Sequence, residues 1–202
     1  MISAMATVSG SSPGADPLRE GWANGSRAPN AAAGQRRISC VLTTCNAAGT
    51  LRLMVPLLSE ALTRSGHAWE LIAVDAASID ESPTVLRSWC QLPGYRLIAL
   101  DEPVPHQRAV RIGIEGARGD AVIVLDARVD QPLHVIGGMI QRWQLGHRMV
   151  YAVRDEATGR CDLYSIGVAD GSARTGPPDP GASDRHAALA LVDREFVRIL
   201  LR

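Results

Sequence analysis

Two aspartates stand where this sequence could do chemistry, because each follows directly on a short apolar run. Asp75 ends one run and Asp126 ends another, with Arg128 and Asp130 two and four positions after Asp126. A charged group at the end of a buried run needs a polar partner, because burying it alone is costly. Carboxylate oxygens placed this way suit two tasks: holding a nucleoside, and ligating a hard divalent cation that bridges phosphates. Capping of the helices that follow is the simpler interpretation.

The elements that must position these aspartates alternate along the chain. Apolar runs typical of buried strands cover 36–44, 69–75, 95–100, 121–125 and 149–154, and helical spacing covers 48–64, 84–91, 106–117 and 133–145. This alternation predicts an α/β domain with a mostly parallel sheet and helices on both faces. Ligands of such sheets bind beyond the carboxyl ends of the strands, so Asp75 and Asp126 should lie at the same edge.

The chain of 202 residues has the length of one domain with a tail. Residues 1–36 are rich in Ala, Gly, Ser, Pro and Asn, which predicts a disordered extension. We expect the domain to occupy residues 37–202. Within it, residues 155–186 are dominated by Gly, Asp, Pro and Ser and are expected to form a long irregular loop, before a final apolar segment that ends in a helix.

Composition excludes several classes of function. The 21 basic residues, all arginine, balance 21 acidic ones, so no nucleic-acid partner is expected. No apolar run approaches the roughly 20 residues that span a bilayer, so we expect no transmembrane segment. The cysteines lack zinc-ligand spacing and predict reduced thiols in a cytoplasmic protein. The glycine fingerprints of dinucleotide and P-loop sites are absent.

Several motifs, taken in order, resemble family 2 glycosyltransferases of the GT-A fold, and in particular the dolichyl- or polyprenyl-phosphate sugar transferase branch. The opening strand and Asn-containing turn are similar at 38–46, the nucleotide-binding strand and its Asp-Asp-Gly-Ser-x-Asp loop at 70–80, and the following helix at 106–120. The Asp-Ala-Asp metal motif and its proline are similar at 126–132, the next strand at 150–154, and a late strand with a helix start at 189–197. The resemblance covers 37–154 and, more loosely, 187–202.

This resemblance implies a GT-A-like three-layer α/β/α domain that moves a sugar from a UDP- or GDP-sugar to a polyprenyl phosphate. It would act peripherally at the inner face of a membrane. The residues that the resemblance assigns to nucleotide binding are Thr44, Asn46, Asp75, Ser78, His106 and Gln107; those assigned to catalysis are Asp126, Arg128 and Asp130. Asp126 and Asp130 would bind Mg²⁺ or Mn²⁺, which would stabilise the departing nucleoside diphosphate. For His106, capping and packing is the alternative, and Asp80 is expected to cap a helix.

The chain also departs from the family pattern. Ala76 and Ala77 replace an aspartate and a glycine of the nucleotide loop, and Arg128 replaces the second carboxylate of the metal motif. The family's late Gly-Asp-Phe-Arg run reads Ala-Ala-Leu-Ala at 187–190. An arginine repels a nearby cation, yet its guanidinium can neutralise a diphosphate through paired hydrogen bonds. Two hypotheses therefore lead: an active glycosyltransferase, and a catalytically inactive GT-A-like domain that binds nucleotide or a partner protein. The order of the motifs disfavours a third, an unrelated α/β nucleotide-binding regulator.

Overall fold

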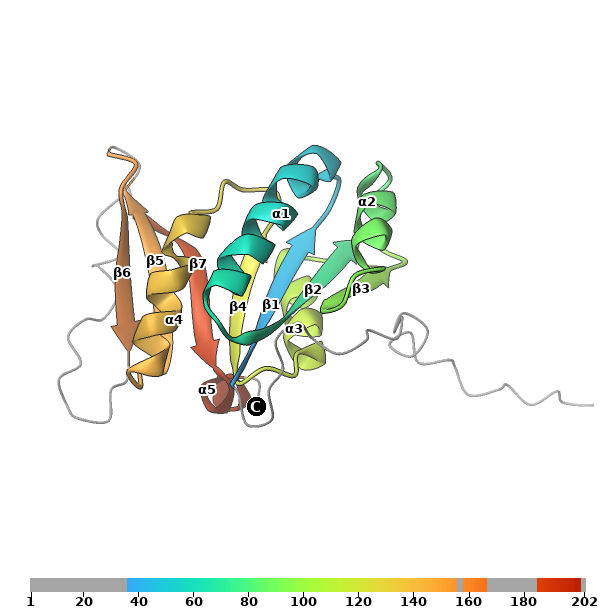
Figure 1. The fold of residues 1–202 in the computed structure, drawn as a ribbon. Helices are drawn as coiled ribbons and strands as arrows, with labels where there is room; N and C mark the ends of the chain where they lie inside the picture. The colour runs from blue at the N-terminus through green and yellow to red at the C-terminus, as the bar shows by residue number, and fades with distance from the viewer. Residues whose placement is uncertain (1–35, 156–157, 167–184, 201–202) are drawn as a thin grey trace, which may run out of the picture.

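The computed structural model describes residues 36–155, 158–166 and 185–200, and Figure 1 shows its helices and strands. The strands are β1 Arg37–Thr44, β2 Ala68–Ala76, β3 Tyr95–Leu100, β4 Ala121–Asp126, β5 Met149–Asp155, β6 Cys161–Ile166 and β7 Arg185–Asp193. The helices are α1 Ala48–Arg64, α2 Ser82–Trp89, α3 His106–Gly116, α4 Ile136–Gln144, which follows a 3₁₀ turn at Leu133–Val135, and α5 Arg194–Leu200. Every strand and helix expected before residue 155 is present.

The strands form one sheet in the order β3-β2-β1-β4-β7-β5-β6. The first four strands are parallel to one another, whereas β7 is antiparallel to both β4 and β5, and β5 is antiparallel to β6. Five of the seven strands therefore run in one direction. The prediction of a mostly parallel sheet is confirmed, and an antiparallel extension is added at one side.

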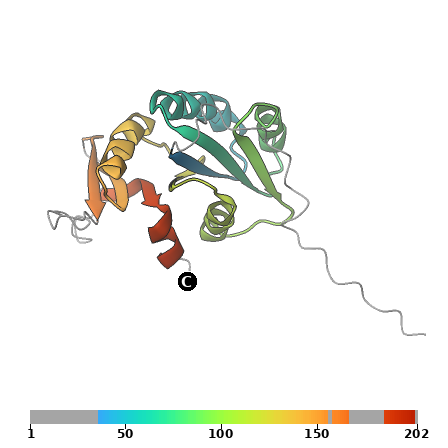
Figure 2. The ribbon, with the colours of Figure 1, turned by 60° about the horizontal axis from the view of Figure 1, so that its bottom comes forward.

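Helices cover both faces of this sheet, as Figure 2 shows. Successive side chains of β1, such as Val41 and Leu42, belong to two separate apolar clusters on opposite faces of the sheet. The cluster that holds Leu42 contains the buried faces of α1, α2 and α4, and the cluster that holds Val41 contains those of α3 and α5. Because strand side chains alternate between faces, one sheet fills both clusters. The predicted three-layer α/β/α arrangement is confirmed.

Helix α3 lies unusually close to the sheet, and a glycine makes this possible. A Cβ atom added at Gly113 would lie 2.3 Å from Cγ1 of Val41 and 3.0 Å from Cγ2 of Val74. Real Cβ atoms do not approach carbon this closely, so only glycine fits without a shift of the helix. This packing determines where the first residue of α3, His106, meets the sheet edge.

A buried ion pair joins the amino-terminal halves of the parallel strands. Oε2 of Glu70 on β2 accepts a hydrogen bond of 3.0 Å from Nη1 of Arg96 on β3, and both side chains are at most 10% exposed. Oε1 of Glu70 accepts hydrogen bonds from Ser39 Oγ on β1 and from the backbone N–H of Arg118, each at 2.7 Å. These groups are structural, because they lie at the opposite end of the strands from Asp75 and Asp126.

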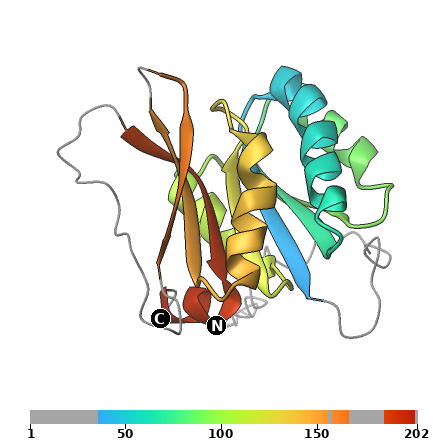
Figure 3. The same cartoon turned by 60° about the vertical axis from the view of Figure 1, so that its left-hand side comes forward.

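The expectation of an irregular loop over 155–186 is wrong where the structure describes it. Residues Cys161–Ile166 form β6, which pairs antiparallel with β5 (Figure 3), and between the two strands the N–H of Gly159 donates to the carbonyl of Asp155 at 2.8 Å. β6 is a short, half-exposed edge strand without a continuous apolar run. Its sequence alone therefore does not mark it as a strand, and its pairing with β5 determines its conformation. Residues 156–157 and 167–184, and residues 1–35 of the expected extension, lie outside the described residues.

Among the described residues, no helix is both long enough and apolar enough to cross a bilayer.

Candidate functional site

The end of β4 presents an aspartate that is held by an arginine two residues later. Arg128 donates from Nη2 to Oδ2 of Asp126 at 2.7 Å, and from Nε to Oδ1 at 3.0 Å and to Oδ2 at 3.2 Å. The backbone N–H of Arg128 also donates to Oδ1 at 2.9 Å. The side chain of Asp126 is only 13% exposed, whereas that of Arg128 is 48% exposed. The guanidinium of Arg128, in the turn after β4, therefore occupies both carboxylate oxygens of Asp126.

Two further polar groups meet Asp126 from neighbouring elements. The Nδ1 atom of His106, at the start of α3, lies 3.4 Å from Oδ2 of Asp126 and 3.2 Å from Oγ1 of Thr43 on β1. The hydroxyl of Thr43 donates to the carbonyl of Leu125 at 3.2 Å. We call Thr43, His106, Asp126 and Arg128 the Asp126 cluster. It joins β1, β4 and α3 at the carboxyl edge of the sheet.

Electrostatics keep the aspartate and the arginine of this cluster ionised. Burial raises the pKa of Asp126, but hydrogen bonds and charge from Arg128, with a contribution from His106, outweigh it and leave that pKa below its usual range. In turn, the hydrogen bonds to Asp126 raise the pKa of Arg128 against the effect of its own partial burial. The pair therefore carries one full negative and one full positive charge at neutral pH.

Asp75 belongs to a second group, at the ends of β1 and β2. Its carboxylate accepts a hydrogen bond from the hydroxyl of Ser78, which in turn accepts one from the backbone N–H of Asn46 at 2.8 Å. Oδ1 of Asn46 accepts a hydrogen bond from the N–H of Ile79 at 2.8 Å. Asp75, Ser78 and Asn46 therefore connect the loop after β1 to the loop after β2. Thr44 lies opposite Asp75 in the ladder, and its buried hydroxyl has no partner among the described residues.

Asp80 connects the same two loops and acts as a cap. Its Oδ1 accepts a hydrogen bond from the N–H of Ser82, the first residue of α2, at 2.9 Å, and its Oδ2 accepts one from Ala48, the first residue of α1, at 3.1 Å. Hydrogen bonding to the side chain of Ser82, followed by these two backbone bonds, lowers the pKa of Asp80 despite some desolvation. The expected capping role of Asp80 is confirmed, and it extends to both helices.

The two strand-end aspartates share an edge of the sheet but not a face. Asp126 pairs in register with Thr43 of β1, whereas Asp75 pairs with Thr44. Because successive residues of a strand point to opposite faces, the Asp75 group lies on the α1 side and the Asp126 cluster on the α3 side. A ligand that spans the end of β1 would contact both.

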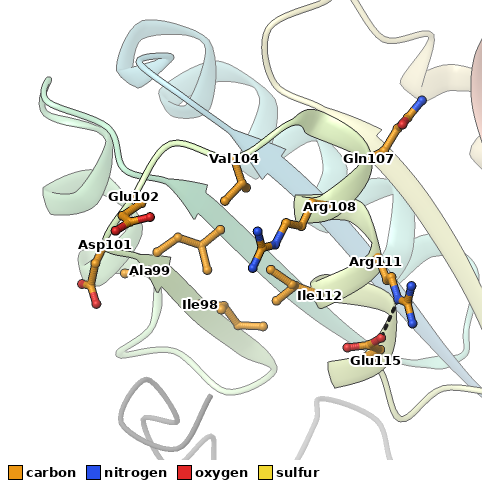
Figure 4. Close-up of a pocket in the computed structure, with 11 residues that line it drawn as sticks. Ile98, Ala99, Asp101, Glu102, Val104, Gln107, Arg108, Arg111, Ile112 and Glu115 are labelled. Carbon is orange, nitrogen blue, oxygen red and sulfur yellow. Dashed lines mark hydrogen bonds and ion pairs between the residues drawn. The ribbon is translucent and has the colours of Figure 1, made fainter. Parts of the chain in front are cut away.

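Two residues that the resemblance assigned to the site lie apart from the Asp126 cluster. Asp130 is 79% exposed and accepts a hydrogen bond of 2.6 Å from Nη1 of Arg154 on β5. Gln107 is exposed and lines a pocket of about 880 Å³ between β3 and α3, and its side chain points away from the other lining residues in Figure 4. In that pocket Arg108 points towards β3, and Arg111 pairs with Glu115 at 2.9 Å.

The structure also adds two residues that the sequence did not single out. Thr43 contacts His106, and its only signal in the sequence was a hydroxyl at the end of a buried strand. Gln131 is 8% exposed and donates weakly from Nε2 to the carbonyl of Asp126, at 3.4 Å. Its Oε1 atom is buried and has no partner among the described residues.

The side chains present do not fit a divalent cation. Magnesium and manganese require several oxygen ligands converging on one point. Within 36–155, 158–166 and 185–200, no three His, Cys, Asp or Glu side chains converge in this way. Asp126 is neutralised by Arg128, and Asp130 is paired with Arg154. A metal at Asp126 would have to displace a guanidinium that already occupies both carboxylate oxygens.

Comparison with known families identifies the family of this fold. A model of glycosyl transferase family 2 matches residues 39–199, a segment that contains both strand-end aspartates and the Asp126 cluster. The chain therefore belongs to glycosyl transferase family 2.

Two relatives illustrate how far the similarity reaches. The uncharacterized glycosyltransferase YkcC of Bacillus subtilis is 33% identical over 103 residues, which cover 50% of this chain and 32% of that protein. The undecaprenyl-phosphate 4-deoxy-4-formamido-L-arabinose transferase of Pseudomonas paraeruginosa is 29% identical over 120 residues, covering 58% of this chain and 35% of that protein. The matched segment is thus about a third of the length of either relative.

Solved structures confirm the GT-A fold. The mannosyltransferase PcManGT of Pyrobaculum calidifontis, in complex with GDP-Man and Mn²⁺, has a TM-score of 0.61 at 20% identity, covering 91% of this chain and 51% of that one. TarS of S. aureus has a TM-score of 0.57 at 11% identity, covering 81% and 49%. At these identities the likeness concerns the fold alone.

Proposed function

We propose that this chain transfers a sugar from a UDP- or GDP-sugar to a polyprenyl phosphate at a membrane surface. The observation that carries the proposal is the placement of the Asp75 group and the Asp126 cluster on either side of the end of β1, within a family 2 domain. In open α/β sheets this edge is where ligands bind. A nucleotide sugar suits a site with two polar groups of side chains, because its nucleoside and its diphosphate can each bind to one of them.

The nucleoside is assigned to the Asp75 side of β1. Asp75, Asn46 and Ser78 already form a connected set of hydrogen-bonding groups there, and the unpartnered hydroxyl of Thr44 lies beside them. A buried hydroxyl without a partner is costly, so a ligand that bonds to it gains affinity. We assign the diphosphate to the other side, where Arg128 provides positive charge.

The transfer itself needs positioning more than a strong base. The bond from the anomeric carbon of the sugar to the diphosphate oxygen breaks, and its electron pair stays on that oxygen. An oxygen of the acceptor phosphate forms the new bond to the anomeric carbon. The second pKa of a phosphate monoester is about 6, so this oxygen is mostly deprotonated at neutral pH. The protein must hold the two reactants in line and stabilise the departing diphosphate.

The acceptor is proposed from the relatives, several of which are named undecaprenyl-phosphate sugar transferases. A polyprenyl phosphate is embedded in a bilayer with its phosphate at the surface. The chain would therefore act peripherally, at the inner membrane face that presents this phosphate.

The test is a transfer assay with the full chain. Radiolabelled UDP- and GDP-sugars are incubated with vesicles that contain undecaprenyl phosphate, and lipid-extractable label is counted. We expect label in the lipid phase, and its loss in Asp75→Asn and Asp126→Asn. Asp162→Asn, on the exposed side of β6, is the matched control that keeps activity. Absence of transfer with every donor would reject the enzyme assignment.

One observation favours a second candidate, a nucleotide-binding domain without transferase activity. Arg128 occupies the carboxylate on which a metal-dependent transferase of this kind would rely. Cys45 offers a readout of nucleotide binding that does not depend on transfer, since it is half-buried and directly follows Thr44 at the end of β1. Protection of Cys45 from alkylation by UDP or GDP, without any transfer, would support the inactive domain.

A further inference from the structure

The Asp126–Arg128 pair is more than an ion pair on the surface. Four hydrogen bonds join the two residues, three from the guanidinium and one from the backbone N–H of Arg128. Such geometry holds the guanidinium plane fixed relative to the end of β4, because a forked donor on a carboxylate leaves little rotational freedom. The cation is therefore preorganised at the carboxyl edge of the sheet.

Much of this guanidinium remains available to a ligand. Arg128 uses Nε and Nη2 on Asp126, and its side chain is 48% exposed. No acceptor in the described part of the chain bonds to its Nη1 group. An arginine held on one side and open on the other can donate two or three hydrogen bonds to phosphate oxygens.

The other carboxylate of the motif does not compete for this position. Asp130 is directed to Arg154, so the charged partner of Arg128 is Asp126, with His106 beside it. One carboxylate and one guanidinium cancel, and the site offers an anion no net repulsion. A divalent cation placed here would meet the charge of Arg128 at close range, which is unfavourable.

We propose that Arg128 replaces the divalent cation at this site and binds the diphosphate of the nucleotide sugar directly. Asp126 is then a positioning residue, which orients the guanidinium rather than ligating a metal. The proposal rests on the proposed function, because it assumes that a nucleoside diphosphate binds at this edge. It goes beyond that function by naming the group that neutralises the departing diphosphate.

The experiment is calorimetric titration of the full chain with UDP and with GDP, in EDTA and in MnCl₂. We expect the better of the two ligands to bind with the same Kd, within about twofold, in both buffers. Arg128→Gln should weaken binding roughly 10- to 100-fold in either buffer, because it removes a charge-assisted hydrogen bond from the ligand. Arg128→Lys, which keeps the charge and loses the fork, should fall between wild type and Arg128→Gln.

The control variant is Arg64→Gln, at the end of α1, which removes an arginine that is also paired with a carboxylate but lies outside the site. Wild-type binding that requires Mn²⁺ would overturn the role of Arg128 and leave the nucleotide site standing. Unchanged binding by Arg128→Gln in EDTA would overturn it as well. Absence of binding in both buffers would overturn both this inference and the proposed function. Thermal unfolding of each variant shows whether it is folded.

Discussion

His106 Nδ1 and Asp126 Oδ2 lie 3.4 Å apart, which brings the first turn of α3 to the end of β4. The same nitrogen lies 3.2 Å from the hydroxyl of Thr43. We expect His106→Ala to weaken binding of UDP or GDP roughly three- to tenfold, because Asp126 loses a polar neighbour and Thr43 loses a hydrogen-bond partner at the end of β1. Calorimetric titration measures the change. His134→Ala, an exposed histidine in the 3₁₀ turn before α4, is the control, and equal Kd values for both variants would contradict the prediction.

If Arg128 takes the place of the cation, as we propose, a second substitution should create a dependence of nucleotide binding on metal. Arg128→Asp replaces the guanidinium by a carboxylate next to Asp126, so that two carboxylates face the diphosphate position. Binding of UDP or GDP in EDTA should fall roughly 100-fold, because one attraction becomes a repulsion. Mn²⁺ should restore part of it by bridging the carboxylates and the diphosphate. Titration in both buffers tests this, and binding that is unaffected by the substitution would refute it.

The loop after β2 contains a local strain that one substitution should relieve. Ala77 has a φ of +56°, in the left-handed region, and it stands where the family motif has glycine. A left-handed alanine costs roughly 1–2 kcal/mol, which glycine avoids, although glycine also gains entropy in the unfolded chain. We expect Ala77→Gly to raise the free energy of unfolding by about 0.5–1 kcal/mol in urea titration. Destabilisation by a similar amount would contradict the assigned backbone conformation.

Close packing of α3 gives a prediction with an internal control. Gly113→Ala should destabilise the fold by roughly 1–3 kcal/mol, because the new methyl group meets Val41 and Val74 at distances that require a shift. Gly137→Ala, in α4, adds the same methyl group with no heavy atom within 4 Å. It should stabilise by about 0.5–1 kcal/mol, because alanine favours a helix over glycine. Urea unfolding of both variants checks the contrast, and equal effects would refute the packing argument.

Asp193 should make stability depend on pH in the acid range. Burial raises its pKa, but hydrogen bonds from Trp143, the N–H of Glu195 and Arg148 outweigh this and lower it. A carboxylate with a lowered folded pKa stabilises the protein fully above its unfolded pKa of about 3.9, and loses that contribution as the pH falls through the folded value. Asp193→Asn should therefore flatten the fall of unfolding free energy below about pH 5. Urea unfolding at several pH values measures this fall, and an equal fall in both proteins would contradict the prediction.

The sequence predicted the parallel half of the sheet because each of its strands carries its own signal. β1, β2 and β4 are buried almost throughout, so their apolar runs stand out between polar turns. β6 is half exposed and depends on β5 for its place. The position of β7 between β4 and β5 has no local signature, because only the pairing of strands distant in the sequence specifies it.

The sequence predicted where the residues of the candidate site lie, but not which groups they contact. Strand ends located Asp75 and Asp126, since the edge of a parallel sheet follows from the alternation of elements. The contacts of these residues were not predictable, because they depend on turn geometry and on other elements. Arg128 folds back onto Asp126 through the conformation of a short turn, and Asp130 turns to Arg154, 24 positions along the chain.

The order of strands in the sheet also constrains how this domain folds while it is being synthesised. In the sheet β7 lies between β4 and β5 and pairs with both, and its residues 185–193 follow both of them in the sequence. While the ribosome is still adding those residues, the β1–β4 unit and the β5–β6 hairpin each expose an unpaired strand edge, and such edges favour aggregation. Insertion of β7 removes both edges in one step. A nascent chain stalled before residue 185 therefore exposes the edges of both β4 and β5 and is prone to aggregate.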